Sequence, residues 1–472
     1  MEDYTAKELS EKLFCKKASA FEKFDQSDLE SADSYAKDYA VFLDSSKTER
    51  EAVDYTVDML TAYGFKPYTL GMGVYPGDRL YLVNRNKSLI AFTIGASGVE
   101  EGFRILAAHI DSPRLDLKQH PIYEDNGVCY AKTHYYGGIR KYQWATTPLS
   151  LHGVVTLKGG RNVNVVIGEK EGDPIFCITD LLPHLAKEQN AKTLGTAFTG
   201  EGLNVILCST PYCEGGRVAE TDDKIKLNLL SMLYDKYGIT ESDLISAELC
   251  FVPAVKACEV GLDRALIGAY GHDDRVCAYS ELTAFLENLD GDNSLMCVLA
   301  DKEETGSDGP TGMQGRLMID VIEEVSRSLG SDPVMVRAAS KCLSADVAAA
   351  FDPNYPDVFE KANSALISCG VAVAKYTGSG GKYSTNDSPA EFMGEIRTVL
   401  DRAGVLWQTA ELGKVDAGGG GTVAKYISRY NIDTLDIGVP VLSMHAPFEL
   451  ISKYDLYSAH KAFSAFCAYD KQ

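Results

Sequence analysis

Apolar residues recur along most of this chain at the spacing of amphipathic helices or of buried strands. Residues 1–64 have a helical pattern, which is clearest between 48 and Gly64, where the glycine ends the helix. The same spacing predicts further helices at 224–237, 276–289, 314–329, 389–403, 422–431 and 454–468. Short apolar runs predict buried strands within 80–95 and at 103–110, 295–300, 365–376 and 435–440.

The pattern changes between residues 113 and 253, where short alternating runs are separated by glycine-rich turns. Residues 154–167 are typical of a β-hairpin. Strands and helices alternate again from about residue 255. We therefore predict an α/β fold in which residues 1–112 and 255–472 form one domain with a central sheet flanked by helices. Residues 113–254 are predicted to be a β-rich insert.

Composition and charge narrow the function classes. The chain has 472 residues, which favours more than one domain. Its 46 Lys and Arg against 67 Asp and Glu give a net charge of −21, which speaks against binding to nucleic acid or to an anionic membrane. The acidic N-terminus has no signal-peptide pattern, no apolar run is long enough to span a membrane, and the 12 cysteines include no C-x-x-C pair. These features predict a cytoplasmic protein with reduced thiols.

The stretch 301–309 places adjacent carboxylates and then glycines directly after the strand predicted at 295–300. In open α/β sheets, ligands bind outside the carboxyl ends of the strands. Glu303 and Glu304 are neighbours that point in different directions, so one can bind a metal while the other transfers a proton. A solvated acidic turn explains this stretch equally well when it is taken alone.

Other acids and histidines lie at predicted strand ends or in loops. His109 and Asp111 are two residues apart in extended chain, so the carboxylate can orient the imidazole ring. Each such residue alone has an ordinary structural explanation, such as a helix cap, a turn cap or a satisfied histidine. The full set is His109, Asp111, Asp273, Asp274, Asp346 and His445.

Taken together, two histidines and several well-separated carboxylates suit a site for two divalent metal ions. Zinc accepts such mixed nitrogen and oxygen ligands, and manganese or cobalt are alternatives. A water bridging the ions would be acidified to a hydroxide, and a glutamate that binds no metal would move protons.

These segments resemble the M18 family of dinuclear zinc aminopeptidases, the aspartyl aminopeptidase-like enzymes. The order and spacing fit along nearly the whole chain, insert included. The matching segments are 108–113, the segment around Asp273, 301–307, 344–346, 443–445 and, in the insert, 136–138 and 183–185.

The resemblance implies a role for each matching residue. His109 and His445 would be terminal ligands, one for each of two zinc ions per subunit. Glu304 and Asp346 would complete the two metal spheres, and Asp273 would bridge them. Glu303 would be the general base and acid, and Asp111 would orient His109.

One departure from the family pattern leaves the bridging ligand open between two residues. Asp274 stands where the family often has asparagine. We favour Asp273 as the bridge, because Asp274 can form a local ion pair with Arg275.

The resemblance also implies a quaternary structure and substrate contacts. The insert would be a dimerisation domain, and dimers would assemble into a homododecamer. His184 of the insert would reach the active site of a neighbouring subunit, although it can equally pack locally. Lys375 would lie near the substrate and favour an acidic N-terminal residue, although it can equally be a solvated loop lysine.

The sequence thus predicts a metalloaminopeptidase that releases an N-terminal residue, either Asp or Glu or a neutral one such as Leu, from peptides. A metal-bound bridging hydroxide would attack the carbonyl, with Glu303 as the base. Two alternatives are open. A deblocking aminopeptidase or deacylase would cleave acylated substrates, and a non-enzymatic scaffold would lack metal ligands.

Overall fold

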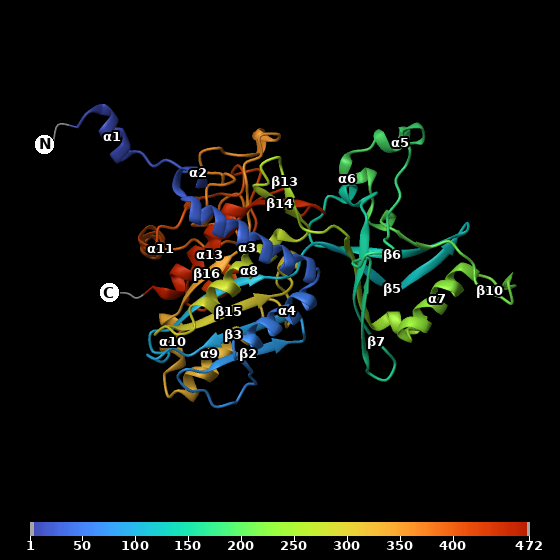
Figure 1. Ribbon diagram of the computed structural model, residues 1–472, viewed down its shortest axis with the longest axis horizontal. Coiled ribbons are helices and arrows are strands. Elements are labelled where there is room, and N and C mark those ends of the chain that lie inside the picture. The colour runs from blue at the N-terminus through green and yellow to red at the C-terminus, as the bar shows by residue number, and fades with distance from the viewer. Residues whose placement is uncertain (1–3, 470–472) are drawn as a thin grey trace.

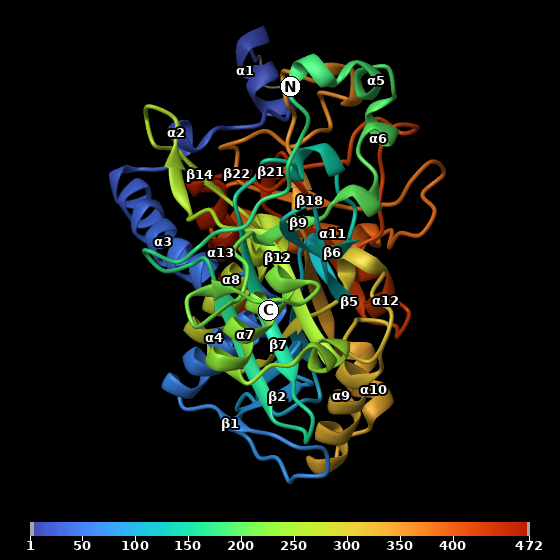
Figure 2. The ribbon, with the colours of Figure 1, turned by 90° about the vertical axis from the view of Figure 1, so that its right-hand side faces the viewer.

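A computed structural model describes residues 4–469. It consists of a large α/β body, made of segments from both ends of the chain, and a β-rich insert that projects from one side (Figure 1). Viewed from the side of the insert, the α/β body lies behind it (Figure 2).

The α/β body is built on a nine-stranded mixed sheet. Its central strands β15, β4, β16 and β20 run parallel, whereas β3 is antiparallel to β15 and β18 is antiparallel to β20. In spatial order the strands are β1 (Lys66–Pro67), β2 (Arg79–Asn84), β3 (Ser88–Thr93), β15 (Ser294–Ala300), β4 (Phe103–His109), β16 (Lys341–Ala345), β20 (Asp433–Gly438), β18 (Val371–Ala374) and β19 (Trp407–Thr409).

Helices cover both faces of this sheet because its strands are apolar on both sides. In β4, Leu106 and Ala108 belong to one buried cluster, and Ile105 and Ala107 belong to the other. The first face is covered by α3 (Gln26–Ser45), α4 (Glu49–Ala62), α8 (His272–Glu287), α11 (Ala390–Arg402) and α13 (Lys453–Ala468). The second is covered by α9 (Leu317–Ser328), α10 (Pro333–Ala339) and α12 (Ala424–Ser428).

Smaller elements complete the body. A five-stranded sheet contains, in spatial order, β13 (Cys258–Val260), β14 (Leu266–Ala269), β22 (Glu449–Ser452), β21 (Pro440–Leu442) and β17 (Ala348–Ala349). Two short helices, α1 (Ala6–Leu13) and α2 (Ala20–Lys23), precede α3. Among residues 4–469, no helix is both long and apolar enough to cross a membrane.

The insert has its own sheet and its own apolar core. Helix α7 (Lys224–Tyr237) contributes Ile225 and Leu229 to that core. The six strands are, in spatial order, β8 (Asn162–Ile167), β7 (Leu149–Thr156), β12 (Ala247–Pro253), β5 (Arg114–Asp125), β6 (Val128–Tyr136) and β9 (Val205–Cys208). The remaining elements are α5 (Lys187–Asn190), α6 (Leu194–Ala197) and the hairpin of β10 (Cys213–Glu214) and β11 (Arg217–Val218).

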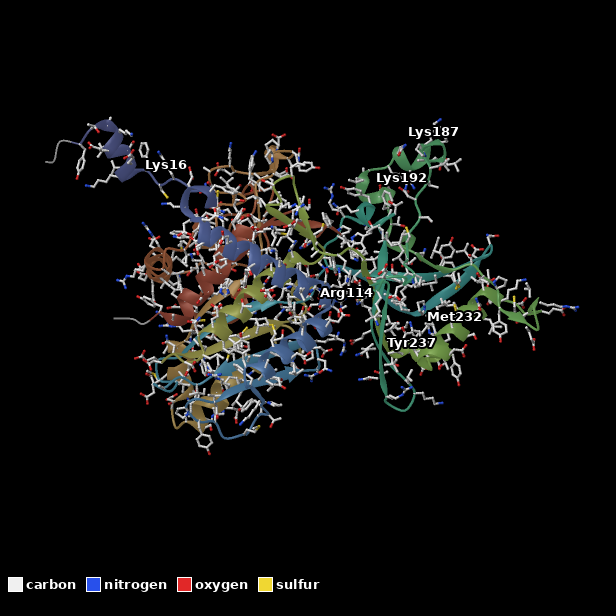
Figure 3. All side chains as sticks on the ribbon, in the orientation of Figure 1. Lys16, Arg114, Lys187, Lys192, Met232 and Tyr237 are labelled. Atoms are coloured by element: carbon white, nitrogen blue, oxygen red, sulfur yellow. The ribbon has the colours of Figure 1, made fainter. Side chains whose placement is uncertain are left out.

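Charged side chains join the insert to the α/β body. Arg114 lies at the junction (Figure 3), where its Nη1 donates to Glu49 Oε2 at 2.8 Å. His152 of β7 lies within hydrogen-bonding distance of two carboxylates, with Nδ1 2.7 Å from Glu51 Oε1 and Nε2 3.1 Å from Glu169 Oε1. Glu49 and Glu51 are both on α4, so this helix carries one side of the junction.

The structure confirms the predicted α/β fold class and most predicted elements, and one strand is shorter than expected. The strand predicted at 365–376 is reduced to Val371–Ala374. The backbone turns at Ser368 and Gly370, which have φ of 60° and 86°. The carboxylate of Asp455 accepts both of their amide N–H groups at 2.7 Å, which stabilises the turn. The insert boundaries at 113 and 254 stay a prediction.

Candidate metal centre

The parallel order of the central strands gathers side chains from distant segments at one edge of the sheet. β15, β4 and β16 are neighbours that run in the same direction, so their carboxyl ends meet there. His109 is the last residue of β4, Glu303 and Glu304 follow β15 in a short 3₁₀ turn, and Asp346 follows β16.

Two other segments bring their side chains to the same edge. Asp273 lies in the first turn of α8, where its backbone dihedral angles are not helical. His445 follows β21 with φ of 64°, and its backbone N–H donates to Glu449 Oε1 at 2.7 Å. Glu449 Oε2 also accepts the N–H of Asp273 at 3.2 Å, so one buried carboxylate holds both segments. No pattern in the sequence indicates this role of Glu449.

These side chains form two clusters that share Asp273. In the first cluster, His109 Nε2 lies 3.2 Å from Asp273 Oδ1 and 3.8 Å from Asp346 Oδ1. In the second, His445 Nε2 lies 3.0 Å from Asp273 Oδ2 and 3.5 Å from Glu304 Oε1. In each cluster of three, the candidate ligand atoms lie within 4.8 Å of one another. Each cluster therefore has the compactness and the donor types of a divalent metal site.

Unsatisfied polar atoms show that these residues fit a metal. His109 Nε2, Asp273 Oδ1 and Glu304 Oε1 are buried, and none has a hydrogen-bond partner among the described residues. Buried polar atoms without partners are costly, and coordination to a cation removes that cost.

Asp274 belongs to neither cluster. Both of its carboxylate oxygens are buried without a hydrogen-bond partner in the described part of the chain. Among the described residues, Asp274 and Arg275 do not form the expected ion pair. The Arg275 guanidinium instead donates to the backbone carbonyl of Lys47 at 2.9 Å. Burial and the neighbouring Asp346 raise the pKa of Asp274 well above its ordinary value.

Hydrogen bonds fix the tautomers of both histidines. His109 Nδ1 lies 3.1 Å from the carbonyl oxygen and 3.2 Å from Oδ1 of Asp111, which are both acceptors. His445 Nδ1 lies 2.7 Å from the carbonyl oxygen of Gly138. Each Nδ1 therefore carries the proton and donates, which leaves Nε2 free to bind a metal.

The Asp111 carboxylate is itself fully engaged. Its Oδ1 accepts the N–H of Glu303 at 3.1 Å, and its Oδ2 accepts the N–H of Glu304 at 3.2 Å and the hydroxyl of Tyr136 at 2.7 Å. Asp111 therefore ties the end of β4 to the glutamate turn as well as to His109.

The insert contributes to this edge through residues 136–138. Tyr136 donates to Asp111, and Gly138 accepts from His445. A Cβ on Gly137, whose φ is 76°, would lie 3.1 Å from Glu304 Oε2. Only a residue without a side chain fits this approach readily.

Burial and the attraction between histidines and carboxylates determine the pKa values of the clustered residues. Burial disfavours the imidazolium form, but the surrounding carboxylates outweigh it and raise the pKa of His109 well above its ordinary value and that of His445 to about 11. Burial and the nearby Asp346 raise the pKa of Glu303 to about 8. Positive charge is thus strongly favoured here, and a metal ion would supply it while displacing the histidine protons.

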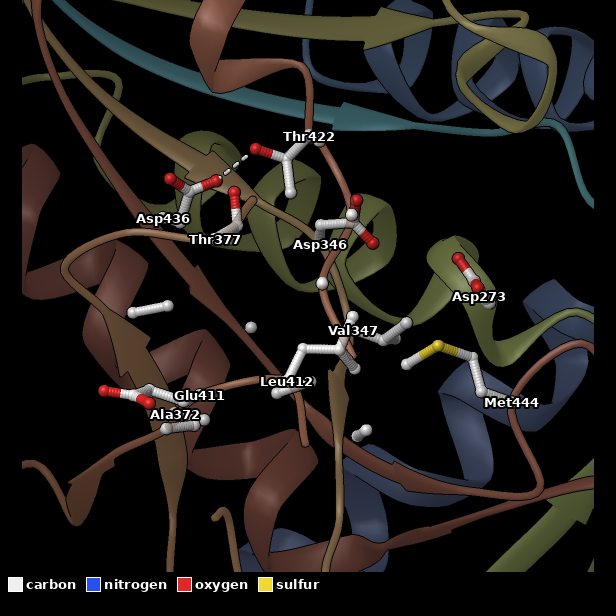
Figure 4. A pocket seen from close by; sticks show the side chains of 18 of the residues that line it. Asp273, Asp346, Val347, Ala372, Thr377, Glu411, Leu412, Thr422, Asp436 and Met444 are labelled. Atoms are coloured by element: carbon white, nitrogen blue, oxygen red, sulfur yellow. Dashed lines mark hydrogen bonds between the residues drawn. The ribbon is translucent and has the colours of Figure 1, made fainter. Parts of the chain in front are cut away.

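A cavity of about 310 Å³ opens beside the two clusters (Figure 4). Asp273, Glu303, Asp346 and His445 line it at the metal end. Val347, Leu412 and several alanines and glycines line the rest. The cavity therefore offers room for a largely apolar group next to the clusters.

Two predicted substrate-binding residues lie outside this cavity. Lys375 is not among the lining residues, and its Nζ pairs with the Asp387 carboxylate. His184 lies in an exposed 3₁₀ turn of the insert, Pro183–Leu185, and does not line the cavity of its own chain. Their predicted roles stay predictions.

Comparisons with known proteins agree on one class. The family model described as aminopeptidase I zinc metalloprotease (M18) matches residues 42–467. A probable M18 family aminopeptidase 1 from Clostridium acetobutylicum is 44% identical over 456 residues, which are 95% of this chain and 97% of the relative.

Solved structures agree as well. The crystal structure of an M18 family aminopeptidase from Thermotoga maritima has a TM-score of 0.91 and 40% identity, and the match covers 96% of this chain and 99% of that one. The dodecamer structure of mApe1 from S. cerevisiae, at 21% identity and a TM-score of 0.74, shares the fold, with 93% of this chain and 97% of that one covered.

The fold, the paired histidine and carboxylate clusters and these matches define a metallo-aminopeptidase. The chain belongs to the M18 family of aminopeptidases.

Proposed function

We propose that this aminopeptidase uses two zinc ions per subunit to release the N-terminal residue of peptides. His109 and Asp346 would hold one ion, and His445 and Glu304 the other. Asp273 would bridge them. The observation that carries this proposal is that the two oxygens of Asp273 approach different histidines, at 3.2 and 3.0 Å. Cobalt or manganese suits the same ligands.

The bound ions would acidify a water molecule and polarise the carbonyl of the scissile peptide bond. Glu303 is assigned the proton transfers, because it lines the cavity without belonging to either cluster. It would accept a proton from the attacking water and deliver it to the leaving amine. Asp111 would hold the His109 ring and the backbone of the glutamate turn in place.

The preference for the N-terminal residue includes a proposed role for Lys375. The resemblance implies an acidic or a neutral residue, and Lys375 would pair with an acidic side chain if its Nζ leaves Asp387. The ratio of kcat/KM for Asp-leading and Leu-leading peptides, measured in wild type and Lys375→Ala, tests this. An unchanged ratio would remove Lys375 from substrate recognition.

We also propose self-association through the insert into a homododecamer built from dimers, with His184 near a neighbouring active site. The exposed turn that carries His184 and the dodecameric yeast relative support this assembly. Light scattering on the purified protein should give the mass of twelve chains, and a monomer would contradict the proposal.

The proposed activity is tested by metal content and peptide cleavage together. Elemental analysis of freshly purified protein should give about two metal ions per chain. A chelator should abolish cleavage, and zinc should restore it. Cleavage of N-acylated but not of free-amine peptides would indicate a deblocking enzyme instead. A protein without metal or activity, even after addition of zinc, cobalt or manganese, would indicate a scaffold.

A further inference from the structure

The cavity wall also carries a carboxylate that belongs to neither metal cluster, that of Asp436. Asp436 of β20 is directly opposite Ala374 of β18, and Gly438 is opposite Ala372. Directly opposed residues of antiparallel strands point to the same face of the sheet. All four residues line the cavity, so the Asp436 side chain projects from its wall. Figure 4 shows Asp436 beside Thr422, on the far side of the cavity from Asp273.

The Asp436 carboxylate lacks a partner that balances its charge. The side chain is 3% exposed, Oδ1 accepts a hydrogen bond from the Thr422 hydroxyl, and Oδ2 has no hydrogen-bond partner among the described residues. Burial and the nearby Asp346 raise the pKa of Asp436 to about 7. A buried carboxyl in this state is stabilised as an anion when a cation comes close to it.

The rest of the cavity carries one further carboxylate among uncharged side chains. Glu411 also lines it, with Oε1 accepting from the Tyr376 hydroxyl at 2.5 Å. Within the described part of the chain, no lysine or arginine lines the cavity. Small or aliphatic residues also line it: Val347, Ala348, Ala372, Ala374, Ala410 and Leu412.

We propose that this cavity receives an extended cationic side chain at the substrate's N-terminus, lysine or arginine, and that Asp436 is the specificity-determining residue. The inference rests on the proposed aminopeptidase function, which places the substrate's first residue beside the metal clusters. The methylenes of such a side chain would contact the apolar walls, and its charged end would reach the carboxylates.

This arrangement disfavours acidic first residues, so it is the alternative to the role proposed above for Lys375, and the same comparison of peptides decides between them. An Asp or Glu side chain would bring a third carboxylate beside Asp436 and Glu411 with no lining lysine or arginine to compensate it. A leucine side chain fits the walls but leaves Asp436 without a partner. The expected order of kcat/KM is therefore Lys or Arg, then Leu, then Glu.

The test compares peptides that differ only in their first residue, Lys, Arg, Leu or Glu, with the zinc-loaded protein. In wild type, kcat/KM should be highest for Lys or Arg. Asp436→Asn should lower the ratio of Lys to Leu by at least about tenfold, since a hydrogen bond to a charged group is lost. Glu411→Gln, at a less buried position, should lower it by a smaller factor. Asp433→Asn is the matched control, because Asp433 is an exposed residue at the start of the same strand and should leave the ratio unchanged.

Each outcome is decisive. A wild-type preference for Leu or Glu would overturn the inference, whatever the variants do, and would leave the proposed function standing. An unchanged Lys to Leu ratio in Asp436→Asn would also overturn it. If Asp436→Asn does not fold, the wild-type profile and Glu411→Gln decide the question. Absence of cleavage of every peptide, despite bound zinc, would instead refute the proposed function.

Discussion

Asp273 and Glu303 lie at the same edge of the sheet, but their carboxyl groups have pKa values shifted in opposite directions. Asp273 presents an oxygen to each histidine, and those contacts outweigh burial and lower the pKa of the carboxyl below its ordinary value. Glu303 faces the cavity with its pKa raised to about 8. Separate ionisation behaviour is what a ligand and a proton carrier require.

Glu303→Gln should separate metal binding from catalysis. Glutamine has nearly the same shape but cannot accept and return a proton. We expect kcat to fall by about 10² to 10⁴-fold, with about two metal ions per chain retained. Elemental analysis and steady-state kinetics measure the two quantities on one preparation. Glu391→Gln, at an exposed position in α11, is the control. Near wild-type activity in Glu303→Gln would assign the proton transfers to another group.

At the scale of elements, apolar periodicity predicts the helices and strands well because burial creates that periodicity. The α7 helix was predicted at its observed bounds, and 154–167 is a hairpin of β7 and β8 as expected. Periodicity does not predict a turn that depends on hydrogen bonds between the backbone and a distant polar side chain. The turn at Ser368 and Gly370 depends on Asp455, 85 residues away from Gly370, and no local pattern reports such a contact.

The candidate site likewise combines features that local sequence predicts with contacts that it does not. His109 and Glu304 lie at strand ends that the sequence predicts, and Asp273 precedes a predicted helix, so residue types and order indicate a metal site. Their convergence depends on strand order, which one sequence does not contain. Asp436 was missed because it looks like an ordinary strand residue, and only the register opposite Ala374 places it on the cavity face. The predicted pairing of Asp274 with Arg275 was wrong because the long guanidinium reaches a distant backbone carbonyl.

Helix α8 provides a test of packing at this scale. Phe285 is fully buried between the sheet and the outer helices, and its ring centroid lies 5.5 Å from that of Phe65. Phe285→Ala removes this contact and leaves a cavity, so we expect a loss of about 3–5 kcal/mol in the free energy of unfolding. Urea denaturation measures it. Phe14→Ala, with 66% of the side chain exposed, should leave the midpoint unchanged. Equal effects of the two substitutions would contradict the described core.

For the whole molecule, the junction between insert and α/β body is held by ionic contacts. Burial disfavours the charged form of His152, but Glu169 and Glu51 outweigh it and raise its pKa. Burial likewise opposes ionisation of Glu169, but His152 and Lys256 lower its pKa to about 2. The stability that these contacts contribute should therefore decrease both at high pH, where His152 loses its proton, and at low pH, where Glu169 gains one.

The sign of each contribution follows from linkage. The contribution of His152 is fully present below the ordinary histidine pKa of about 6.5 and is lost as pH rises through the higher folded value. That of Glu169 is present above about pH 4.3 and is lost as pH falls toward 2. The difference in unfolding free energy between wild type and His152→Gln should therefore shrink as pH rises from about 6 to 9. His134→Gln, an exposed histidine of the same sheet, should show no such trend. A constant difference for His152→Gln would contradict the ionic account of the junction.

The contact between Gly138 and His445 has a consequence for how this enzyme can be engineered. The carbonyl that fixes the proton of His445 comes from the insert, while the ring comes from the α/β body. Tyr136 supports Asp111 across the same boundary. The insert is therefore a structural part of the candidate metal centre rather than an interchangeable module. An enzyme could be shortened by joining residue 112 to 255, or given a foreign insert. Either version must supply a backbone acceptor for His445 and a phenol for Asp111, so that both imidazole rings stay oriented.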